Sequence, residues 1–343
     1  MFVSYSTSDE FSIHTGISLV SLFENNKEED RIVVYLMDLG IREENKERLL
    51  KIAGKYGREL HFLLTDDKKI REFLGEGIPE HYGSLATYAR LCAPFLYPAE
   101  VHRIMYIDSD MVVCDSLHEV YHLDMGEKIV AAVPEKHEVD YIAGASREEA
   151  GIVESHPLYF NAGFLMIDID NWNKANFSQT IRETAAGLRE FTNKDQSILN
   201  AAISEAQFYR LPFRYNYPMH RYPRYLIKGW GKHAEPLTPE EVAEADRNPA
   251  IVHYKGAQSR PWFKENTSCM AGYYYKYKAM SPYADVPLSS IFDSGKFQNA
   301  SFFGKAYMKL VYAVFQKRIG YPIFLINQAR INATIAKRKR KKK

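Results

Sequence analysis

The sequence predicts an α/β protein of three layers, in which a doubly wound, largely parallel sheet lies between two layers of helices. Two observations lead to this prediction. Strand-like and helix-like segments alternate along the chain, and one strand-like run ends in an acidic loop, the place where ligands bind in open α/β sheets. With 343 residues, 46% of them hydrophobic and 26% charged, the chain has an ordinary globular composition and is long enough for a large core.

The alternating pattern extends to about residue 191. Residues 2–6 form the first strand-like run, and a helical pattern follows over about residues 10–25. Further strands are expected at residues 31–37, 59–64, 104–107, 128–133 and 164–169. Further helices are expected at residues 43–56, 86–97 and 181–191. Residues 211–285 are rich in Tyr, Pro, Arg and Trp and lack periodicity, which is typical of long functional loops.

The acidic loop is Asp108-Ser109-Asp110, directly after the apolar run Arg103–Ile107. Residues two apart on a strand point to the same face, so the two carboxylates can converge on one cation. Mg²⁺ and Mn²⁺ take a few carboxylate oxygens and leave positions open for substrate phosphates. No glycine-rich nucleotide-binding loop follows the first strand, so a metal is expected to neutralise any diphosphate. The alternative is a polar turn that ends a strand.

Six motifs in a fixed order resemble those of retaining glycosyltransferase family 8, whose bacterial members include lipooligosaccharide α-galactosyltransferases. The motifs are Ser18–Asn26, Thr87–Leu91, Asp108–Asp110 (which resembles the DxD motif), Tyr159–Gly163, Lys194–Asn200 and His253–Gly256 leading to Arg260-Pro261-Trp262. The resemblance covers roughly residues 1–265 and implies a GT-A fold. It also implies a UDP-sugar donor (galactose or glucose), a saccharide or lipid-linked glycan acceptor, and an α-linked product.

The resemblance makes His253 the third protein ligand of the metal, beside Asp108 and Asp110. One imidazole and two carboxylates suit Mn²⁺ better than Mg²⁺, which stays possible as the cofactor. The alternative for His253 is a satisfied core histidine, because it follows two apolar residues. Gly256 favours the site, since its bare backbone lets the chain approach a phosphate closely.

The resemblance also implies which residues contact the donor. The matching positions are Ser6, Ser8, Arg90, Asp108, Ser109, Asp110, Asn161, Gly163, Asp195, Gly256 and Arg260. Arg260 is expected to neutralise the diphosphate, although the family usually has Lys there and one residue fewer after the glycine. Its alternative is a surface arginine at a loop. Arg90 is expected to reach the donor sugar and phosphate, and its alternative is to pair with a carboxylate of the body.

The nucleotide is expected at the end of the first strand. The family commonly has Asp at the position of Ser8 and a side-chain amide at the position of Glu10, so this chain departs from the pattern. The backbone of Ser6 is still expected to hold uracil. Tyr5 or Phe11 is expected either to stack on the base or to belong to the core.

The expected catalytic residues are Asn161, Asp195 and Gln196. A double displacement needs a nucleophile on the β-face of the sugar, usually a carboxylate, and the matching residue here is Gln196. We therefore expect a front-side mechanism, in which a phosphate oxygen of the departing UDP helps to deprotonate the acceptor. Asp195 would orient the sugar and the carbonyl of Gln196 would stabilise the oxocarbenium-like centre. The alternative for Asp195 is a helix N-cap.

The C-terminal segment predicts a separate unit, residues 291–343, after a catalytic domain over residues 1–290. From residue 305 onward there are 12 Lys or Arg and no acid, which leaves 33 basic and 43 acidic side chains in residues 1–304, a net of −10. Aromatic and apolar residues recur there at helical spacing, as in helices that lie on anionic membranes. The alternative is a solvated end. The acidic body argues against nucleic acid as a partner.

The expected location is the cytoplasm, peripheral on the inner face of the plasma membrane. Cys92, Cys114 and Cys269 are scattered and odd in number, which favours a reducing compartment. Because the chain starts on a strand-like run, no signal peptide is expected, and no run of 18 apolar residues predicts a membrane span.

Two other functional classes remain open from the sequence. The DxD pair with following Met and Val also fits a haloacid-dehalogenase-type phosphatase, although no later acidic pair accompanies it. A carbohydrate-binding relative without catalysis is the second. The intact Asp108, Asp110 and His253 argue against loss of the metal site.

Overall fold

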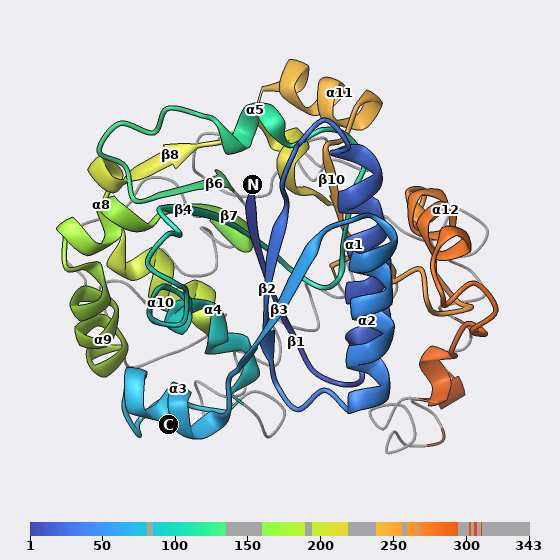
Figure 1. The fold of residues 1–343 in the computed structure, drawn as a ribbon, viewed down its shortest axis with the longest axis horizontal. Helices are drawn as coiled ribbons and strands as arrows, with labels where there is room; N and C mark the ends of the chain where they lie inside the picture. The colour runs from blue at the N-terminus through green and yellow to red at the C-terminus, as the bar shows by residue number, and fades with distance from the viewer. Residues whose placement is uncertain are drawn as a thin grey trace.

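The computed structural model describes residues 1–80, 85–134, 160–188, 194–218, 238–255, 259–266 and 268–293, together with residues 302, 305, 306 and 310. Its centre is a seven-stranded sheet with the order β3-β2-β1-β4-β7-β6-β8 (Figure 1). These strands are β1 (Phe2–Thr7), β2 (Val33–Asp38), β3 (Glu59–Leu64), β4 (Arg103–Ile107), β6 (Val130–Pro134), β7 (Phe160–Asp168) and β8 (Phe208–Arg210). All six strands expected from the sequence are present.

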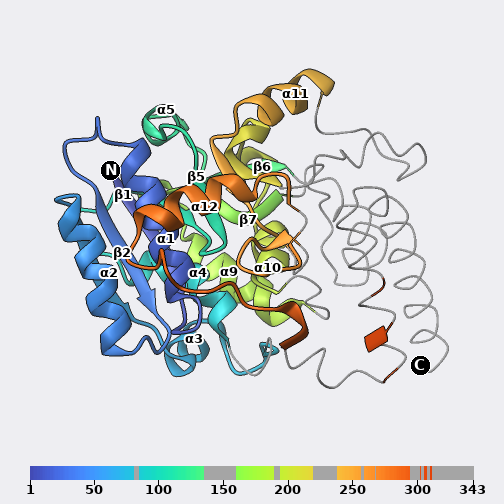
Figure 2. The same cartoon turned by 90° about the vertical axis from the view of Figure 1, so that its right-hand side faces the viewer.

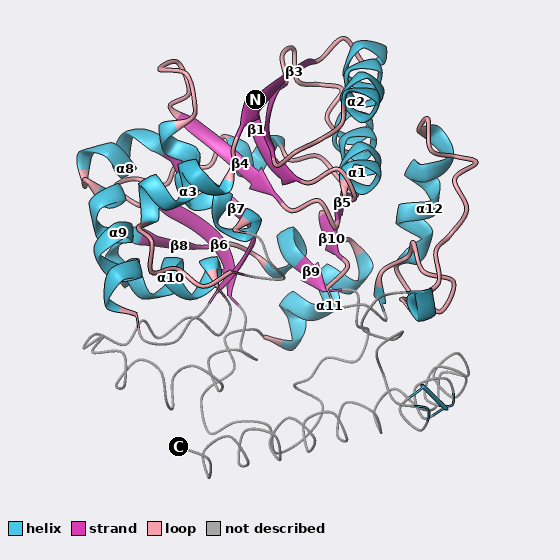
Figure 3. Cartoon of the chain, turned by 90° about the horizontal axis from the view of Figure 1, so that it is seen from below, coloured by secondary structure: helices cyan, strands magenta, loops and turns pink. Residues whose placement is uncertain are grey.

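The helices cover both faces of this sheet. They are α1 (Ser12–Asn25), α2 (Glu43–Lys55), α3 (Asp67–Leu74), α4 (Ala89–Cys92), α5 (His118–Tyr121), α8 (Ile169–Lys174), α9 (Phe177–Gly187), α10 (Asp195–Ala202), α11 (Pro239–Arg247) and α12 (Ala271–Met280). Figure 3 shows α1 and α2 on one side of the strands and α8, α9 and α10 on the other.

Alternation along β2 explains why the chain forms three layers. Val34 and Leu36 belong to the core that α1 and α2 close, whereas Val33, Tyr35 and Met37 belong to the core under α3 and α4. Successive side chains of a strand point to opposite faces, and all six residues of β2 are buried. A strand that is apolar on both faces needs helices on both. The prediction of a three-layer α/β fold is confirmed.

The sheet is parallel from β3 through β4, but β7 runs antiparallel to both β4 and β6. Its register places Phe164 opposite Ile107 at the end of β4. The first residues of β7 therefore lie beside the loop that leaves the carboxyl end of β4. This reversal brings the Asn161–Gly163 segment to the acidic loop.

A second, small sheet carries His253 to the same place. It consists of β5 (Met111–Val113), β10 (Ile251–His253) and β9 (Tyr217–Pro218), in the order β5-β10-β9. The antiparallel pairing of β10 with β5 sets His253 opposite Met111. The backbone N–H of Tyr254 donates to the carbonyl of Asp110 at 2.9 Å and fixes that register.

The expectation of an irregular segment over residues 211–285 was wrong in part. The described residues of that region include α11 and α12 besides the two short strands. The sequence carries a signal for α11, because Thr238 and Glu241 form a capping box with Pro239 in the first turn. In α12 the buried face is made by Tyr274 and Tyr277, which amphipathic patterning recognises poorly. Figure 2 shows α12 across the outer side of α1, against which it packs.

The helix expected at residues 86–97 is shorter than predicted and divided. Two 3₁₀ turns, Ala86–Tyr88 and Ala93–Phe95, flank the four residues of α4. Pro94 lies in the second turn and limits the continuation of an α-helix. Among the described residues, no helix has the length and apolar character needed to cross a membrane.

Candidate active site

The acidic loop lies between β4 and β5, so both carboxylates follow the strand rather than lie on it. The backbone N–H of Asp108 donates to the carbonyl of Gly163 at 2.8 Å, which ties the loop to the start of β7. From the sequence, the two carboxylates were expected to converge because they would lie on one face of a strand. In the structure they lie in a turn instead. The outcome is the same, because Asp108 and Asp110 face a common point with His253.

Asp108, Asp110 and His253 form one cluster, in which one ligand atom of each lies within 4.8 Å of the others. His253 Nε2 is 3.2 Å from Asp110 Oδ1. His253 is buried, as expected for the core histidine that was the alternative to a metal ligand. Its ring nevertheless faces the acidic loop. Two carboxylates and one imidazole are a donor set that fits a divalent cation of the first transition row.

The side-chain amides beside this cluster have only one consistent orientation. The backbone N–H of Gly163 donates to Asn161 Oδ1 at 3.0 Å, and that of Ala162 donates to Gln196 Oε1 at 3.0 Å. Because a backbone N–H only donates, both acceptors are oxygens. Asn161 Nδ2 then donates to Gln196 Oε1 at 3.0 Å.

The same chain of amides continues to His253. Asn216 Nδ2 donates to Asn161 Oδ1 at 2.8 Å, so Asn216 Oδ1 faces His253 Nδ1 at 3.0 Å. That oxygen can only accept, and the hydrogen must therefore lie on Nδ1 of His253. Nε2 is therefore the ring nitrogen that faces Asp110. Asn216 thus directs Nε2 of His253 toward the acidic loop.

Gly163 has a steric role in this arrangement. A Cβ atom at this position would lie 2.6 Å from His253 Cε1, 2.7 Å from Met111 Cε and 2.9 Å from Asn161 Oδ1. These distances are too short for any side chain, so the bare backbone makes room for the His253 ring. The family resemblance implied that Gly163 contacts the donor, and the structure adds this steric role.

Arg90 joins the two halves of the site. Its Nη2 is 2.8 Å from Asp108 Oδ1, its Nε is 2.9 Å from Asp195 Oδ2, and its Nη1 donates to the carbonyl of Ala162. The guanidinium also lies over the ring of Tyr106, whose hydroxyl donates to Asp108 at 2.9 Å. Arg90 therefore pairs with carboxylates of the protein itself, which was the alternative to contact with the donor. The two carboxylates, Asp108 and Asp195, are themselves predicted site residues.

Asp195 is not a helix cap, so that alternative was wrong. The residue before α10 is Lys194, which makes no side-chain cap bond, and Asp195 is the first helical residue. Its carboxylate accepts from Thr87 Oγ1 and pairs with Arg90. Gln196 follows and is also buried.

Burial and charge act differently on the three acids. Burial raises the pKa of Asp195 and of Asp108, and Arg90 offsets part of this rise at each. Burial also opposes ionisation of Asp110, but His253 and Arg260 more than offset it and hold the pKa of Asp110 well below its usual range. Asp110 is thus the most firmly ionised of the three.

Arg260 faces this ionised carboxylate. Its Nη2 lies 3.5 Å from Asp110 Oδ2, and its guanidinium stacks near Phe11 and Trp262 at 5.5 and 5.4 Å from the ring centroids. Trp262 in turn stacks on His14 at 3.9 Å. The structure brings Arg260 to the predicted site, rather than leaving it at a distant loop.

At the end of β1, hydroxyl groups connect the nucleotide loop to the acidic loop. Ser109 Oγ donates to the carbonyl of Ser6 at 2.9 Å, and Thr15 Oγ1 donates to Ser109 Oγ at 2.8 Å. Ser8 lies one turn away, and its carbonyl accepts from the backbone N–H of Phe11. The predicted donor residues Ser6 and Ser109 are therefore in contact, and Ser8 follows Ser6 by two residues.

Tyr5 belongs to the core: it is fully buried and its hydroxyl shares a hydrogen bond with Ser18 at 3.1 Å. Of the two aromatic residues expected to stack on a base or belong to the core, Phe11 is the one that is only partly buried. Gly256, the remaining predicted donor residue, lies outside the described residues.

Sequence reasoning missed several residues of the site. Thr15, Thr87, Tyr106 and Asn216 hold the predicted residues in place, as described above. A polar residue between aromatic neighbours, as in Tyr215-Asn216-Tyr217, was the one signal available for Asn216.

The fold is that of glycosyltransferases of the GT-A class. The structure superposes on the galactosyltransferase LgtC, solved in complex with donor and acceptor sugar analogues, with a TM-score of 0.64 and 21% identity over 82% of this chain and 96% of LgtC. At that identity the likeness shows the fold.

The chain belongs to glycosyl transferase family 8, whose model matches residues 2–266. It is similar to general stress protein A of Bacillus subtilis, with 26% identity over 81% of this chain and 93% of the relative. It is also similar to lipopolysaccharide 1,3-galactosyltransferase of Salmonella typhimurium, with 24% identity over 83% of this chain and 80% of that enzyme. The family resemblance is confirmed, and the phosphatase alternative was wrong.

Proposed function

We propose that the protein is a Mn²⁺-dependent, retaining hexosyltransferase. It would move galactose or glucose from a UDP-sugar to a saccharide or lipid-linked glycan and form an α-linkage. The observation that carries this proposal is the cluster of Asp108, Asp110 and His253, with Nε2 of His253 directed at the carboxylates. Membership of family 8 supports the reaction class.

The donor set supports Mn²⁺ before Mg²⁺. Asp108, Asp110 and His253 would hold the ion, and Asn216 fixes the ring state that ligation needs. Mg²⁺ prefers a site of oxygens alone, whereas Mn²⁺ accepts one imidazole beside carboxylates. When bound, the metal supplies a Lewis acid that absorbs negative charge on the leaving diphosphate.

Arg260 would bring the second positive charge to the diphosphate. Its guanidinium lies 3.5 Å from Asp110, so it is next to the place where a phosphate would bind at the cluster. Arg90 is held more tightly, by Asp108 and Asp195. We assign it to the donor site, where it fixes both carboxylates and faces the sugar.

The arrangement of Asp195 and Gln196 favours the front-side mechanism. An enzyme nucleophile for double displacement would be a free carboxylate, but that of Asp195 is paired with Arg90 and bonded by Thr87. The carbonyl oxygen of Gln196 accepts from Asn161 and from the backbone of Ala162. Gln196 would therefore place a fixed dipole, rather than a nucleophile, beside the anomeric carbon.

The acceptor and the location belong to the same proposal. A lipid-linked glycan is presented at a membrane, and the exposed Phe302 and Leu310, with Lys305 between them, fit a surface-binding helix. Most of residues 294–343 lie outside the described residues, as do residues 219–237 of the segment expected to be irregular. We propose a cytoplasmic enzyme, peripheral on the inner face of the plasma membrane.

A donor screen tests the proposed function. UDP release would be measured with UDP-glucose, UDP-galactose and their N-acetyl forms, with Mn²⁺ and with chelator, and the anomeric configuration of a transferred sugar would be read by NMR. We expect Mn²⁺-dependent release with at least one hexose donor. Turnover that is indifferent to chelator, or a β-linked product, would contradict the proposal.

Gln196→Ala tests the reaction centre. The variant should reduce turnover sharply, by about 10²-fold or more if the carbonyl acts on developing charge, while UDP binding persists. Asn173→Ala, on the exposed side of α8, is the matched control. If Gln196→Ala turns over near the wild-type rate, the assignment of Gln196 fails.

A further inference from the structure

The described residues contain a second group of metal-type ligands, which the proposed function does not use. Glu29 lies between α1 and β2, and His118 and His122 lie at the start of α5 and just after its end. One ligand atom from each of the three residues lies within 4.8 Å of the others.

The spacing of these atoms suits a small tetrahedral ion. His118 Nδ1 is 2.6 Å from Glu29 Oε1, and His122 Nε2 is 3.8 Å from the same oxygen. Ligands about 2.0–2.1 Å from a tetrahedral Zn²⁺ are separated from one another by roughly 3.3 Å. His118 Nδ1, now at hydrogen-bond distance from Glu29, would move outward and His122 Nε2 inward, each by less than about 1 Å, to reach that spacing. The two imidazoles, one at the start of α5 and one just after its end, lie with their ring centroids 4.4 Å apart.

A buried hydrogen bond holds the two ligand-bearing segments against each other, and a second hydrogen bond fixes the backbone of Glu29. Asn26 is fully buried, and its Oδ1 accepts from the backbone N–H of Leu117 at 2.7 Å. Arg58 Nη1 donates to the carbonyl of Glu29 at 2.6 Å. The backbone on both sides of the cluster is therefore fixed before any ion binds, which lowers the entropic cost of binding.

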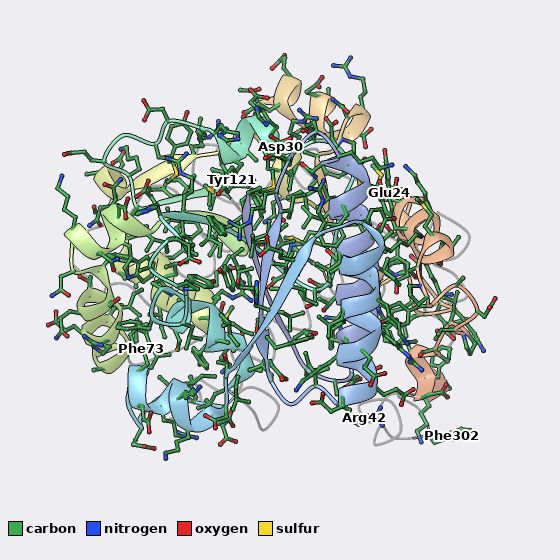
Figure 4. The ribbon with its side chains drawn as sticks, in the orientation of Figure 1. Glu24, Asp30, Arg42, Phe73, Tyr121 and Phe302 are labelled. Atoms are coloured by element: carbon green, nitrogen blue, oxygen red, sulfur yellow. The ribbon has the colours of Figure 1, made fainter. Side chains whose placement is uncertain are left out.

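The cluster lies at the opposite end of the sheet from the candidate active site. The backbone N–H of Phe2, the first residue of β1, donates to the hydroxyl of Tyr121 in α5 at 3.0 Å. Asp108 follows the last residue of β4, which runs parallel to β1. Figure 4 labels Asp30 and Tyr121, the neighbours of Glu29 and His122, together at one end of the view.

We propose that Glu29, His118 and His122 form a second metal site, which binds a borderline divalent cation, best matched by Zn²⁺. Two imidazoles and one carboxylate favour Zn²⁺ over Ca²⁺ or Mg²⁺, which prefer oxygen ligands. His118 and His122 are 59% and 55% exposed, so water has access to complete the coordination. The ion would connect the α1–β2 segment to α5 and stabilise the folded chain through linkage.

Competition between the full-length protein and a chromophoric zinc chelator tests the second site. His122→Ala should weaken Zn²⁺ binding at one site by more than the roughly 10–100-fold that loss of a supporting partner costs. The matched control is His61→Ala, which removes another exposed histidine near a glutamate, Glu59, at 3.7 Å. Unchanged Zn²⁺ affinity and stoichiometry in His122→Ala would overturn the proposal.

The Asp110→Asn variant separates this site from the active site. It should lose the Zn²⁺ bound beside Asp108 and keep the Zn²⁺ bound by Glu29, His118 and His122. Zn²⁺ should also raise the melting temperature of Asp110→Asn, and the additional His122→Ala change should abolish that rise. If the rise persists in the double variant, the second site is not where we place it. Failure of donor turnover would leave this result unaffected.

Discussion

The chemical state of His253 depends on a chain of four side chains that begins at the backbone of β7. The N–H groups of Ala162 and Gly163 fix the amides of Asn161 and Gln196, and Asn216 passes that orientation to His253. The histidine, the reaction-centre glutamine and the start of β7 are thus one hydrogen-bonded unit. Substitution of any of these residues should therefore change the metal affinity of the proposed site.

Asn216→Ala tests that unit at its link to the ligand. Loss of the acceptor for His253 Nδ1 should weaken Mn²⁺ affinity about 10–100-fold, because the ring is no longer held in the ligating orientation. Asn216→Asp keeps an acceptor for Nδ1 but loses the donor to Asn161 Oδ1, so it should recover only part of the affinity. Mn²⁺ binding would be followed by electron paramagnetic resonance, with Asn173→Ala as control. Equal affinity in Asn216→Ala and the wild type would remove Asn216 from the account.

The residues of the site differ in how well they could be predicted from the sequence. Asp108 and Asp110 were found from a local pattern, an acidic pair after an apolar run. His253 came from family resemblance alone, because it is distant in sequence and reaches the pair through pairing of β10 with β5. Asn216 was not found, since its role exists only after β7, β10 and the 3₁₀ turn Phe213–Asn216 meet.

At the scale of elements, strands were predicted better than the C-terminal helices. β3 has the predicted bounds, Glu59–Leu64, because apolar alternation is a local property. The direction of β7 was not predictable from its own residues, because antiparallel pairing depends on the connection that precedes it. α12 was missed because its buried positions are tyrosines, which count as weakly apolar.

The packing of α12 on α1 includes a neutral histidine. His14 in α1 stacks on Trp262, and its Nδ1 is 2.8 Å from the hydroxyl of Tyr274 in α12. Burial, with the nearby positive charge of Arg260, lowers the pKa of His14 to about 3 from its ordinary value of 6.5. The unfolded chain therefore binds a proton here at a higher pH than the folded chain does.

This difference predicts a pH dependence of stability. Between pH 6.5 and about 3 the unfolded state binds more protons at His14, so the free energy of unfolding falls as the pH is lowered through that window. Replacement by a group that does not titrate, His14→Gln, should reduce the slope between pH 7 and pH 5. Urea denaturation at these two pH values measures it, with His61→Gln on the surface as control. An unchanged slope would contradict a buried neutral His14.

At the scale of the whole molecule, charge is divided between an acidic body and a basic C-terminal segment. Residues 1–304 carry a net of −10, whereas the segment from residue 305 carries 12 basic side chains and no acid. Each Lys or Arg near an anionic membrane contributes about 1 kcal/mol to binding. The body is repelled by such a surface and the segment is attracted, which would orient the active site relative to the membrane.

Deletion of residues 301–343 tests this division. The truncated protein should no longer sediment with vesicles of acidic lipid, while Mn²⁺-dependent hydrolysis of the UDP-sugar stays intact, because the predicted site lies within residues 1–290. Vesicles of neutral lipid serve as the control surface. Continued binding of the truncated protein to acidic vesicles would refute membrane attachment through this segment.

The central claim is that Asp108, Asp110 and His253 hold a metal that binds the diphosphate of the donor. Calorimetry of UDP binding with and without Mn²⁺ tests it most directly, on the wild type, on Asp110→Asn and on the surface control Asp170→Asn. The account predicts that Mn²⁺ strengthens UDP binding strongly in the wild type and in Asp170→Asn, but hardly at all in Asp110→Asn. Equal strengthening of UDP binding by Mn²⁺ in all three proteins would contradict it.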